Sequence, residues 1–446
     1  MVKNYGIISV SLLSEKVLAN YTIRIFSVSN TKLKQRSGLA TREIRQYHYT
    51  SWPDHGAPDY PLPILSFIKT SSGREGPGPT VVHCSAGVGR TGAYIVIDSI
   101  LKQLKAKGEL SIDPFLRHIR KQRNFLVQTL EQFVFIHEAL VEIVLSGETS
   151  IKLSYISRYI NSLQSSFTTD ETTVPFQLLE RQFSHVTSFK PTEQQFSAAI
   201  LPYNQLKNQS FDFIPLDGNR VVLSQMPGVD GSDYINASWM PGYTSLNEFI
   251  LTQHPKEQTT EDFWRLVWEQ RVLTVVCLSC VQDPDFPVFW PHEQKRVGNI
   301  IVSPTEEGLL CGFQTKDFSL RLHNETQNMK VRLIFCPEWS SENHSTMLSL
   351  AGVLNSIPSP PILVMDTLGG FQAGTLIALS YLTRQAKVEG CVDVYQTAKT
   401  LHYSRPGIWV SNETLLGLYK ATQTYCLELE NKGKPDGTQD KSKSKF

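Results

Sequence analysis

The sequence predicts an α/β fold in two tandem copies, of which the first is incomplete. Runs rich in Val, Ile, Tyr and Phe at 5–13, 20–28 and 42–52 are typical of β-strands. From Thr91 onward the apolar residues recur at three- and four-residue spacing, which is the pattern of a helix with one buried face. The same order of motifs returns in the second half of the chain, and such a repeat indicates a duplicated structural unit.

Turn signals and periodicity predict the elements that follow the first strands. The run 62–71 predicts a short helix, and the Gly- and Pro-rich run 71–79 predicts a turn. Residues 80–84 form a short apolar run, which predicts a strand. Further helices are expected over 113–123 and 129–145.

An internal repeat sets the expected organisation of the chain. The run 5–15 is echoed by 297–307, and the run 80–92 is echoed by 362–374. In front of the shared first strand, the second copy has a long segment that begins near Phe176, whereas the first copy has almost none. We therefore expect the first domain to lack its N-terminal half.

The repeat also predicts where the domains begin and end. The interval from Cys84 to Arg123 equals the interval from Asp366 to Arg405, so the two copies match through their C-terminal halves. A Ser- and Thr-rich stretch suggests a linker, and the charged C-terminal end suggests a disordered tail. The expected parts are 1–145 (C-terminal half of domain 1), 146–175 (linker), 176–430 (domain 2) and 431–446 (tail).

The composition argues against several classes of partner. The 446 residues include 43 Lys and Arg against 42 Asp and Glu, a net charge of +1, which argues against nucleic acid or an anionic membrane as the main partner. No apolar run approaches the length of a membrane-spanning helix, so we expect no direct membrane insertion. The N-terminus lacks the long apolar stretch of a signal peptide.

The cysteines predict neither a disulfide framework nor a metal site. Their number, seven, is odd, and they are scattered along the chain, which suggests a reducing compartment. Cys277 and Cys280 lie in one apolar run, and no second pair of ligands is near. We interpret them as strand cysteines, because a zinc site needs four ligands.

The string from His83 to Gly92, HCSAGVGRTG, has the design of a phosphate cradle. Its glycines let backbone N–H groups converge on one point, and the following helix presents its N-terminus there. The same field lowers the pKa of a thiol at that point, so Cys84 is the candidate nucleophile. Arg90 can bind two phosphate oxygens, Thr91 can donate to the thiolate, and His83 can orient the loop.

A plain buried cysteine at the end of a strand is the alternative interpretation of Cys84. A cysteine with an arginine six positions later, and nothing else, would favour that alternative. Gly87, Gly89 and Gly92 add a backbone freedom that a core strand does not need, so the whole string favours the cradle.

Cleavage of a phosphate ester needs a proton for the leaving oxygen, and a carboxylic acid on a mobile loop can supply it. The loop from Trp52 to Pro58, WPDHGAP, lies upstream of the cradle and carries Asp54 as the candidate acid. Gly56 permits hinge motion. Alone, the Pro-Asp pair would be an ordinary turn, and its position relative to Cys84 is what favours the catalytic role.

Gln128 and Gln132 follow the cradle in the sequence and carry side-chain amides. An amide can orient the water that hydrolyses a phosphoenzyme without competing as a nucleophile. Alone, the two glutamines would be ordinary residues at the start of a helix.

Taken together, HCSAGVGRTG, the WPDHGAP loop and the QTLEQF segment resemble the cysteine-dependent protein tyrosine phosphatases. The second copy adds DYINAS, TQHP and EDFWRLVWE, at 233–238, 252–255 and 261–269, which are similar to the same family. The tandem arrangement resembles a receptor-type member, and the sequence of domain 2 is most similar to the gamma/zeta subgroup. The resemblance implies the phosphatase fold, with a twisted mixed sheet flanked by helices.

The resemblance implies a role for each motif residue. Cys84 would be the nucleophile, Asp54 the general acid and Arg90 the phosphate binder. Gln128 and Gln132 would orient the water that hydrolyses the phosphoenzyme. It implies phosphotyrosine proteins as substrates, no metal or organic cofactor, and a location in the cytoplasmic portion of a single-pass plasma-membrane receptor. The residues whose backbone amides would form the cradle are Ser85, Ala86, Gly87, Val88, Gly89 and Arg90.

Two departures from the family pattern affect what we expect. The family's tyrosine-recognition loop would lie in the missing half of domain 1, so the wall that stacks on the phosphotyrosine ring should be absent there. Domain 2 has lost its catalytic set and resembles a pseudophosphatase with a regulatory or partner-binding role. Its degenerate positions are Asp366 for the cysteine, Gln372 for the arginine and Ser341 for the acid, with Ser210 in place of the stacking tyrosine.

Two functions stay open at this point. The first is a tyrosine-specific phosphatase that acts through Cys84, with domain 2 inactive and regulatory. The second is a non-catalytic interaction or regulatory fragment, because half of domain 1 is expected to be missing. We predict the enzyme as the function, with weak activity or none for the chain as it stands.

Overall fold

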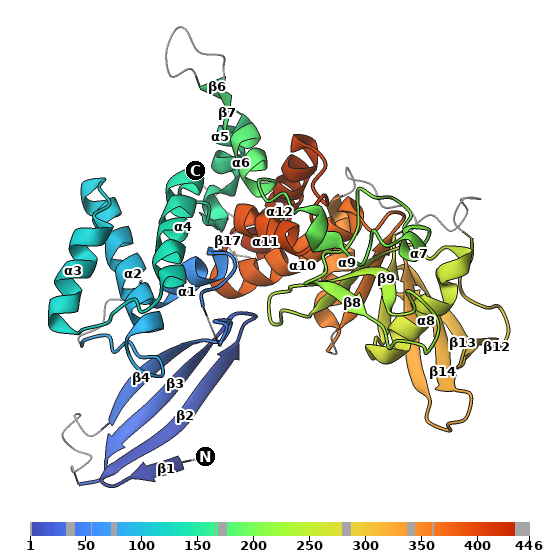
Figure 1. Ribbon diagram of the computed structural model, residues 1–446, viewed down its shortest axis with the longest axis horizontal. Coiled ribbons are helices and arrows are strands. Elements are labelled where there is room, and N and C mark those ends of the chain that lie inside the picture. Colours follow the sequence, from blue (N-terminus) through green and yellow to red (C-terminus); the bar gives the residue numbers. More distant parts are fainter. Residues whose placement is uncertain are drawn as a thin grey trace, which may run out of the picture. The chain divides into compact units, whose positions relative to one another are not determined.

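A computed structural model describes residues 2–32, 41–54, 56–72, 78–164, 166–167, 176–278, 287–336, 344–358 and 361–432. The chain divides into two compact units, Met1–Glu148 (unit 1) and Thr149–Phe446 (unit 2). Figure 1 shows unit 1 in blue to blue-green and unit 2 in green to red.

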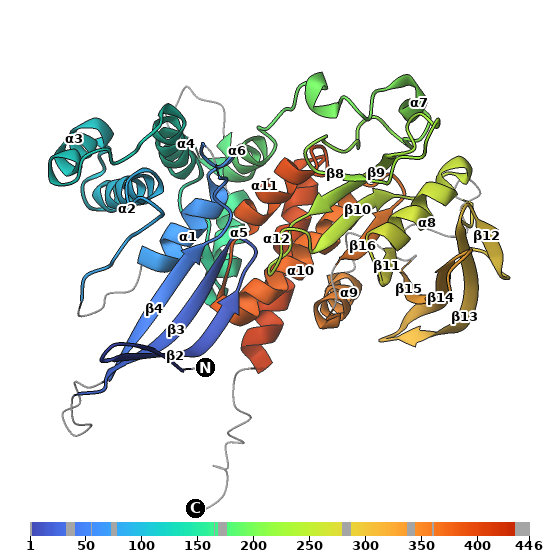
Figure 2. The same cartoon turned by 60° about the horizontal axis from the view of Figure 1, so that its bottom comes forward.

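Unit 1 begins with an antiparallel sheet in which the four strands of the described part follow one another in chain order. The strands appear side by side in Figure 2. The sequence predictions of strands in this part of the chain are confirmed, because the β-branched and aromatic residues there pair across the sheet. The strands are β1 (Val2–Tyr5), β2 (Ile8–Val17), β3 (Tyr21–Asn30) and β4 (Thr41–Tyr49).

Among the described residues of unit 1, four α-helices follow the sheet, and the four predictions of helices are confirmed. They are α1 (Leu62–Ser72), α2 (Gly89–Lys107), α3 (Ile112–Gln122) and α4 (Leu130–Ser146). The helix α2 is followed by Gly108, whose left-handed φ of 71° is the usual way for a chain to leave a helix. The helix α4 starts after Thr129, whose hydroxyl accepts a hydrogen bond from the backbone N–H of Gln132.

The segment 80–84 is not a strand, so that prediction was wrong. Its counterpart in unit 2, β16 (Ile362–Asp366), lies between β10 (Phe249–Gln253) and β11 (Thr274–Cys277) and pairs in parallel with both. The described part of unit 1 contains no counterpart of these two neighbours. The backbone of 80–84 therefore has no ladder to join, and the side chain of Val81 is 82% exposed.

Unit 2 is built on a mixed sheet, which confirms the predicted α/β class. Among the described residues it contains nine strands in the order β12-β13-β14-β15-β11-β16-β10-β9-β8. The central strands from β15 to β10 run parallel to one another, and the outer pairs are antiparallel. The remaining bounds are β8 (Arg220–Val222), β9 (Tyr234–Met240), β12 (Lys295–Val297), β13 (Ile300–Leu310), β14 (Phe313–Leu322) and β15 (Met329–Phe335).

Helices cover both faces of this sheet (Figures 1 and 2). Alternate residues of β16 point to opposite faces: Ile362 and Val364 belong to one buried cluster, and Leu363 and Met365 belong to another. Within the described ranges no helix is long and apolar enough to cross a membrane. The helices are α5 (Ile156–Gln164), α6 (Leu178–Val186), α7 (Pro202–Gln205), α8 (Thr260–Glu269), α9 (His344–Ser356), α10 (Phe371–Glu389), α11 (Val394–Ser404) and α12 (Asn412–Lys432).

The expected linker, 146–175, is in part a structural element of unit 2. The short strand β5 (Ile151–Lys152) pairs with β17 (Cys391–Val392). The helix α5 buries Ile156, Ile160 and Leu163 in the core of unit 2. The linker prediction overlooked this helical spacing of apolar residues, because the Ser- and Thr-rich stretch begins only at its end. Residues 168–175 lie outside the described residues, as do 433–446 of the expected tail.

The internal repeat reappears in the backbone of both units. The β2–β3 ladder shifts register between Leu12 and Ser14, and the β13–β14 ladder shifts between Pro304 and Glu306, at the same place in the repeat. The helices α2 and α10 both have 19 residues, and both end at a glycine in the left-handed conformation. The two copies therefore share details of geometry that their sequences do not make obvious.

A close approach of α2 to the segment before α4 explains one glycine of the cradle string. A Cβ on Gly92 would lie 2.4 Å from the backbone nitrogen of Val127. The carbonyl of Val88 accepts hydrogen bonds from the backbone N–H groups of both Gly92 and Val127. A larger residue at 92 would push this segment away from the helix.

We predict that Gly92→Ala destabilises unit 1, because the clash is with backbone that cannot rotate aside. Overpacking of this kind typically costs about 1–3 kcal/mol of unfolding free energy. Hydrogen exchange of the α2 and α4 amides should become faster than in the parent chain. Gly78→Ala is the matched control, because nothing lies within 4 Å of a Cβ at Gly78. Equal exchange in both variants would contradict the close approach.

Candidate active site

The candidate nucleophile, Cys84, lies directly before the loop that leads into α2. The loop turns at Gly87, whose φ of 69° is in the left-handed region that favours glycine. The hydroxyl of Thr91, in the first turn of α2, donates a hydrogen bond to the Cys84 Sγ over 3.2 Å. The structure thus brings together the cysteine, the loop and the threonine of the motif.

The surroundings of Cys84 favour its thiolate form. Partial burial raises the pKa of the thiol, but hydrogen bonds to the sulfur lower it by more. The donors are the Thr91 hydroxyl and the backbone N–H groups of Thr91, Val88 and Gly87. The net effect lowers the pKa of Cys84 from 9.0 to about 7, so a large fraction of the thiol is ionised near neutral pH.

A residue without an assigned role, Arg123, braces the loop from outside. Its Nε donates to the carbonyl of Gly87 over 2.8 Å, and its Nη2 donates to the carbonyl of Ala86 over 3.3 Å. These bonds orient the loop carbonyls outward, which leaves the N–H groups to face Cys84. In the sequence, Arg123 is marked only by the repeat. It follows Cys84 by the same interval by which Arg405 follows Asp366, and this interval was the available signal.

The loop that carries Asp54 is attached to the cradle through Arg90. The Nη2 of Arg90 donates to the carbonyl of Pro53 over 2.8 Å. The loop is closed by the Trp52 indole N–H, which donates to the carbonyl of Gly56 over 3.2 Å. The Asp54 side chain is exposed, and His55 lies outside the described residues. Arg90 has further N–H donors that can face a bound phosphate.

Gln132 lies against the cradle, whereas Gln128 is exposed nearby. A Cβ on Gly89 would lie 2.9 Å from the amide atoms of Gln132, which shows how closely the two pack. The Oε1 of Gln132 accepts a hydrogen bond from the backbone N–H of Gln128 over 2.9 Å. Both glutamines are therefore held beside the loop.

The segment before these glutamines has an unusual backbone. Phe125 and Val127 both have a φ of 62°, which is uncommon for residues other than glycine. Arg120 holds the segment in place: its Nε donates to the carbonyl of Leu126 over 2.8 Å, and its Nη2 donates to the carbonyl of Val127 over 2.6 Å. Such strain persists only where surrounding contacts fix it. Sequence reasoning did not identify Arg120.

His83 stands apart from these contacts. Its side chain is exposed and makes no hydrogen bond to any described residue. The structure therefore gives no contact through which His83 would orient the loop.

In unit 2 the matching loop is filled by the carboxylate of Asp366. Its Oδ1 accepts hydrogen bonds from the backbone N–H groups of Leu368, over 3.1 Å, and Gly370, over 2.8 Å. Its Oδ2 accepts one from the N–H of Ala373 over 3.0 Å. Asp366 is 4% exposed. A fixed negative charge thus occupies the point on which the N–H groups of the loop converge.

Arg405 holds the unit 2 loop as Arg123 holds the unit 1 loop. Its Nε donates to the carbonyl of Gly369 over 2.8 Å. Arg405 is completely buried, and burial lowers the pKa of its guanidinium to about 10. Its other nitrogens donate to the carbonyl of Phe213, Oδ1 of Asn236 and Oγ of Ser238.

The other degenerate positions of unit 2 carry neither a cation nor an aromatic ring. Gln372 is half-buried at the arginine position. The hydroxyl of Ser210 donates to Oδ2 of Asp212 over 3.2 Å and accepts from its backbone N–H. Ser341 lies outside the described residues. Across the described ranges, no three His, Cys, Asp or Glu side chains are grouped so that they could hold a metal ion.

Comparison with known proteins supports the resemblance. The family model described as protein-tyrosine phosphatase matches residues 1–142 and 204–424. Tyrosine-protein phosphatase 99A of Drosophila melanogaster is 40% identical over 428 residues, covering 94% of this chain and 32% of the relative. Receptor-type tyrosine-protein phosphatase zeta of Homo sapiens is 40% identical over 437 residues, covering 94% and 19%.

A more distant relative, receptor-type tyrosine-protein phosphatase S of Gallus gallus, is 34% identical over 436 residues, covering 94% of this chain and 28% of the relative. The chain thus spans about a third or less of the length of these curated relatives. The family model covers most of both units, and its match in unit 1 includes the cradle, the Asp54 loop and both glutamines. On this evidence the chain belongs to the protein-tyrosine phosphatase family.

Proposed function

We propose that unit 1 hydrolyses phosphotyrosine in proteins through a phosphocysteine intermediate and that unit 2 is a non-catalytic regulatory domain. The observation that carries the proposal is the state of Cys84. Its pKa is lowered to about 7 by the Thr91 hydroxyl and the loop N–H groups, in spite of partial burial. A thiolate at the focus of backbone donors is a nucleophile beside a site for an oxyanion.

In the first step the Cys84 thiolate attacks phosphorus. The S–P bond forms as the bond from phosphorus to the tyrosine oxygen breaks, and the electron pair of that bond goes to the phenolic oxygen. Asp54 gives its proton to this oxygen, so tyrosine leaves neutral. Arg90 and the loop N–H groups stabilise the charge on the equatorial oxygens.

In the second step water attacks the phosphocysteine. The ionised Asp54 takes a proton from the water, the O–P bond forms, and the S–P bond breaks to restore the thiolate. The position of Gln132 against Gly89, with Gln128 bonded to it, supports a role for these amides in placing the water. No group other than these side chains is needed for the step to balance.

Substrate and location are proposed from the relatives. All three are named as tyrosine-protein phosphatases, and two of them as receptor-type, which supports phosphotyrosine proteins as substrates. We place this chain in the cytoplasmic portion of such a receptor.

The filled loop of unit 2 supports its assignment as inactive. The Asp366 carboxylate accepts hydrogen bonds from two backbone N–H groups of the loop and from that of Ala373 in the first turn of α10. Its negative charge repels a phosphate dianion, and Gln372 cannot replace the charge and planar fork of an arginine.

A second candidate function is a non-catalytic interaction fragment. The placement of 80–84 outside any sheet and the exposure of Val81 favour it, because Cys84 directly ends this segment. A cradle without a supporting strand can bind phosphate and still turn over slowly. The two candidates differ in turnover, which the next experiment measures.

We predict that hydrolysis of a phosphotyrosine peptide depends on Cys84. This should hold for the chain itself and for a version extended at its N-terminus with the segment of a relative that corresponds to residues 176–296. Cys84→Ser should abolish turnover and leave peptide binding largely intact, because a serine hydroxyl is not ionised near neutral pH. Retention of more than about a tenth of the parent kcat would contradict the assignment. Turnover by the extended version alone would favour the interaction fragment for this chain.

The thiolate itself can be measured in the same proteins. Alkylation of Cys84 by iodoacetamide should rise with pH and reach half its maximal rate near pH 7. Thr91→Val removes a hydrogen bond to the sulfur, so the midpoint should move to higher pH. An unchanged midpoint would show that Thr91 does not stabilise the thiolate.

We predict that Asp54→Asn slows phosphoryl transfer by about 10²–10⁴-fold, the usual contribution of a general acid. The loss should be greater for phosphotyrosine than for p-nitrophenyl phosphate, whose leaving group needs less protonation. Asp59→Asn is the matched control, because Asp59 is an exposed acid on the same connection. Equal losses for both substrates would exclude Asp54 as the acid.

We predict that Asp366→Cys does not restore activity to unit 2. In a Cys84→Ser background, Gln372 would still lack a charge and Ser210 could not stack on the substrate ring. These losses act on one transition state, so their effects need not add. Turnover of a phosphotyrosine peptide within about tenfold of an intact family domain would contradict our interpretation of unit 2.

A further inference from the structure

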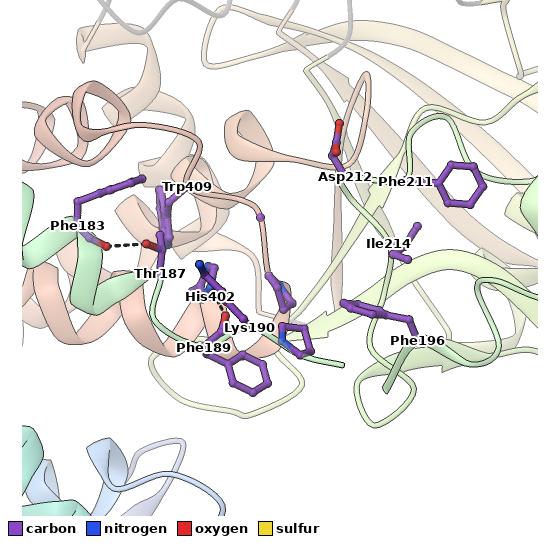
Figure 3. Close-up of a pocket in the computed structure, with 13 residues that line it drawn as sticks. Phe183, Thr187, Phe189, Lys190, Phe196, Phe211, Asp212, Ile214, His402 and Trp409 are labelled. Atoms are coloured by element: carbon purple, nitrogen blue, oxygen red, sulfur yellow. Dashed lines mark hydrogen bonds between the residues drawn. The ribbon is translucent and has the colours of Figure 1, made fainter. Parts of the chain in front are cut away.

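Unit 2 contains a groove that none of the catalytic positions lines. It has a volume of about 460 Å³, within the range of about 300–1,000 Å³ that ligand pockets occupy, and it is open to solvent. The groove lies between the end of α6 with the chain that follows it, the segment 211–214 and the segment 402–409 (Figure 3).

Aromatic side chains are the largest group in the lining of the groove. They come from separate parts of unit 2, namely the α6 segment with the chain after it, the segment 211–214 and the segment 402–409. Aromatic rings pack well against another flat ring. Phe211 lies at the edge, where its side chain is 56% exposed, and Trp409 is 3% exposed. The aromatic lining residues are Phe183, Phe189, Phe196, Phe211 and Trp409.

One buried polar atom of the lining lacks a partner. His402 is 4% exposed, and its Nε2 lies 3.1 Å from the carbonyl oxygen of Phe189. A carbonyl can only accept, so Nε2 carries the proton and Nδ1 has a lone pair. Within the described part of the chain, the Nδ1 of His402 has no hydrogen-bond partner. A buried acceptor of this kind is unfavourable until a donor reaches it.

The imidazole of His402 keeps this acceptor at neutral pH. Burial lowers the pKa of His402, and Lys399 lowers it further, while the hydrogen bond to Phe189 has the opposite effect. Two charged residues of opposite sign, Lys190 and Asp212, also line the groove. The lining therefore has no net positive charge that would hold a phosphate dianion.

We propose that this groove binds the side chain of an unphosphorylated tyrosine in a partner protein, with the hydroxyl donating to the Nδ1 of His402. The phenol ring would pack against the aromatic lining, and the backbone of the partner would continue through the open side. Phenylalanine has the ring and lacks the donor. The ester oxygen of phosphotyrosine has no proton to donate to this nitrogen.

The groove would thus select the dephosphorylated form of a tyrosine. If unit 1 hydrolyses phosphotyrosine, unit 2 would hold the product of that reaction and not its substrate. Only this link rests on the proposed function. The selectivity for tyrosine rests on the groove alone.

The test compares three peptide libraries that differ in one central residue: tyrosine, phenylalanine or phosphotyrosine, with random flanks. Fluorescence anisotropy measures their binding to the full chain carrying Cys84→Ser, so that phosphopeptides are not consumed. We expect the tyrosine library to bind at least about tenfold more tightly than either of the others, the effect of one buried hydrogen bond. Equal or tighter binding of the phenylalanine or phosphotyrosine library would overturn the proposal.

Substitutions of two exposed apolar residues test whether the tyrosine library binds in this groove. Phe211→Ala removes a ring from the edge of the groove and should weaken binding of the tyrosine library by about tenfold. Leu206→Ala is the matched control, because Leu206 is 71% exposed and does not line the groove. Equal binding of the tyrosine library by the two variants would overturn the assignment of the site to this groove. Absence of binding by the parent chain would overturn the proposal. Loss of phosphatase activity in unit 1 would leave these results unchanged, so the two proposals fail separately.

Discussion

A loop whose backbone N–H groups converge on one point must hold an anion there, and the rest of each unit is arranged around this requirement. In unit 1 the anion is the thiolate of Cys84, and in unit 2 it is the carboxylate of Asp366. The physical demand is the same in both, because the dipoles of the loop and of the following helix favour negative charge. The two residues differ in what the charge can do. A thiolate can attack phosphorus, whereas the carboxylate of Asp366 is held by hydrogen bonds from the loop and from the first turn of α10.

The sequence alone predicted the elements whose formation depends on local pattern. The strands β2 to β4 and the helices α1 to α4 follow from residue type and periodicity, and the cradle follows from its glycines. The prediction of a strand at 80–84 was wrong, because a strand depends on neighbours that the local run does not contain. The role of Arg123 could not be predicted either. Its bonds to Ala86 and Gly87 exist only once α3 has brought it beside the loop.

The arginines that hold the two loops, Arg123 and Arg405, have the same position in the repeat but different surroundings. Arg405 is completely buried and makes four hydrogen bonds, one to Gly369 of the loop and three to residues of the segment 211–238. Arg123 is exposed and contacts the carbonyls of the cradle. A buried guanidinium must have all its partners in place, because the loss of one leaves an unpaired charge. Arg405 thus bonds the loop of unit 2 to the core of that unit, whereas Arg123 holds the loop of unit 1 from the surface.

The choice of anion also decides how each loop responds to oxidants. Thiolate character and access to solvent make a cysteine the first target of peroxide, and Cys84 has both. Burial raises the pKa of Cys277, which keeps that thiol protonated and shielded. A carboxylate has no comparable redox chemistry. An oxidising pulse would therefore convert the sulfur in unit 1 to a sulfenic acid, which thiols can reduce again, and would leave the Asp366 loop of unit 2 unaltered.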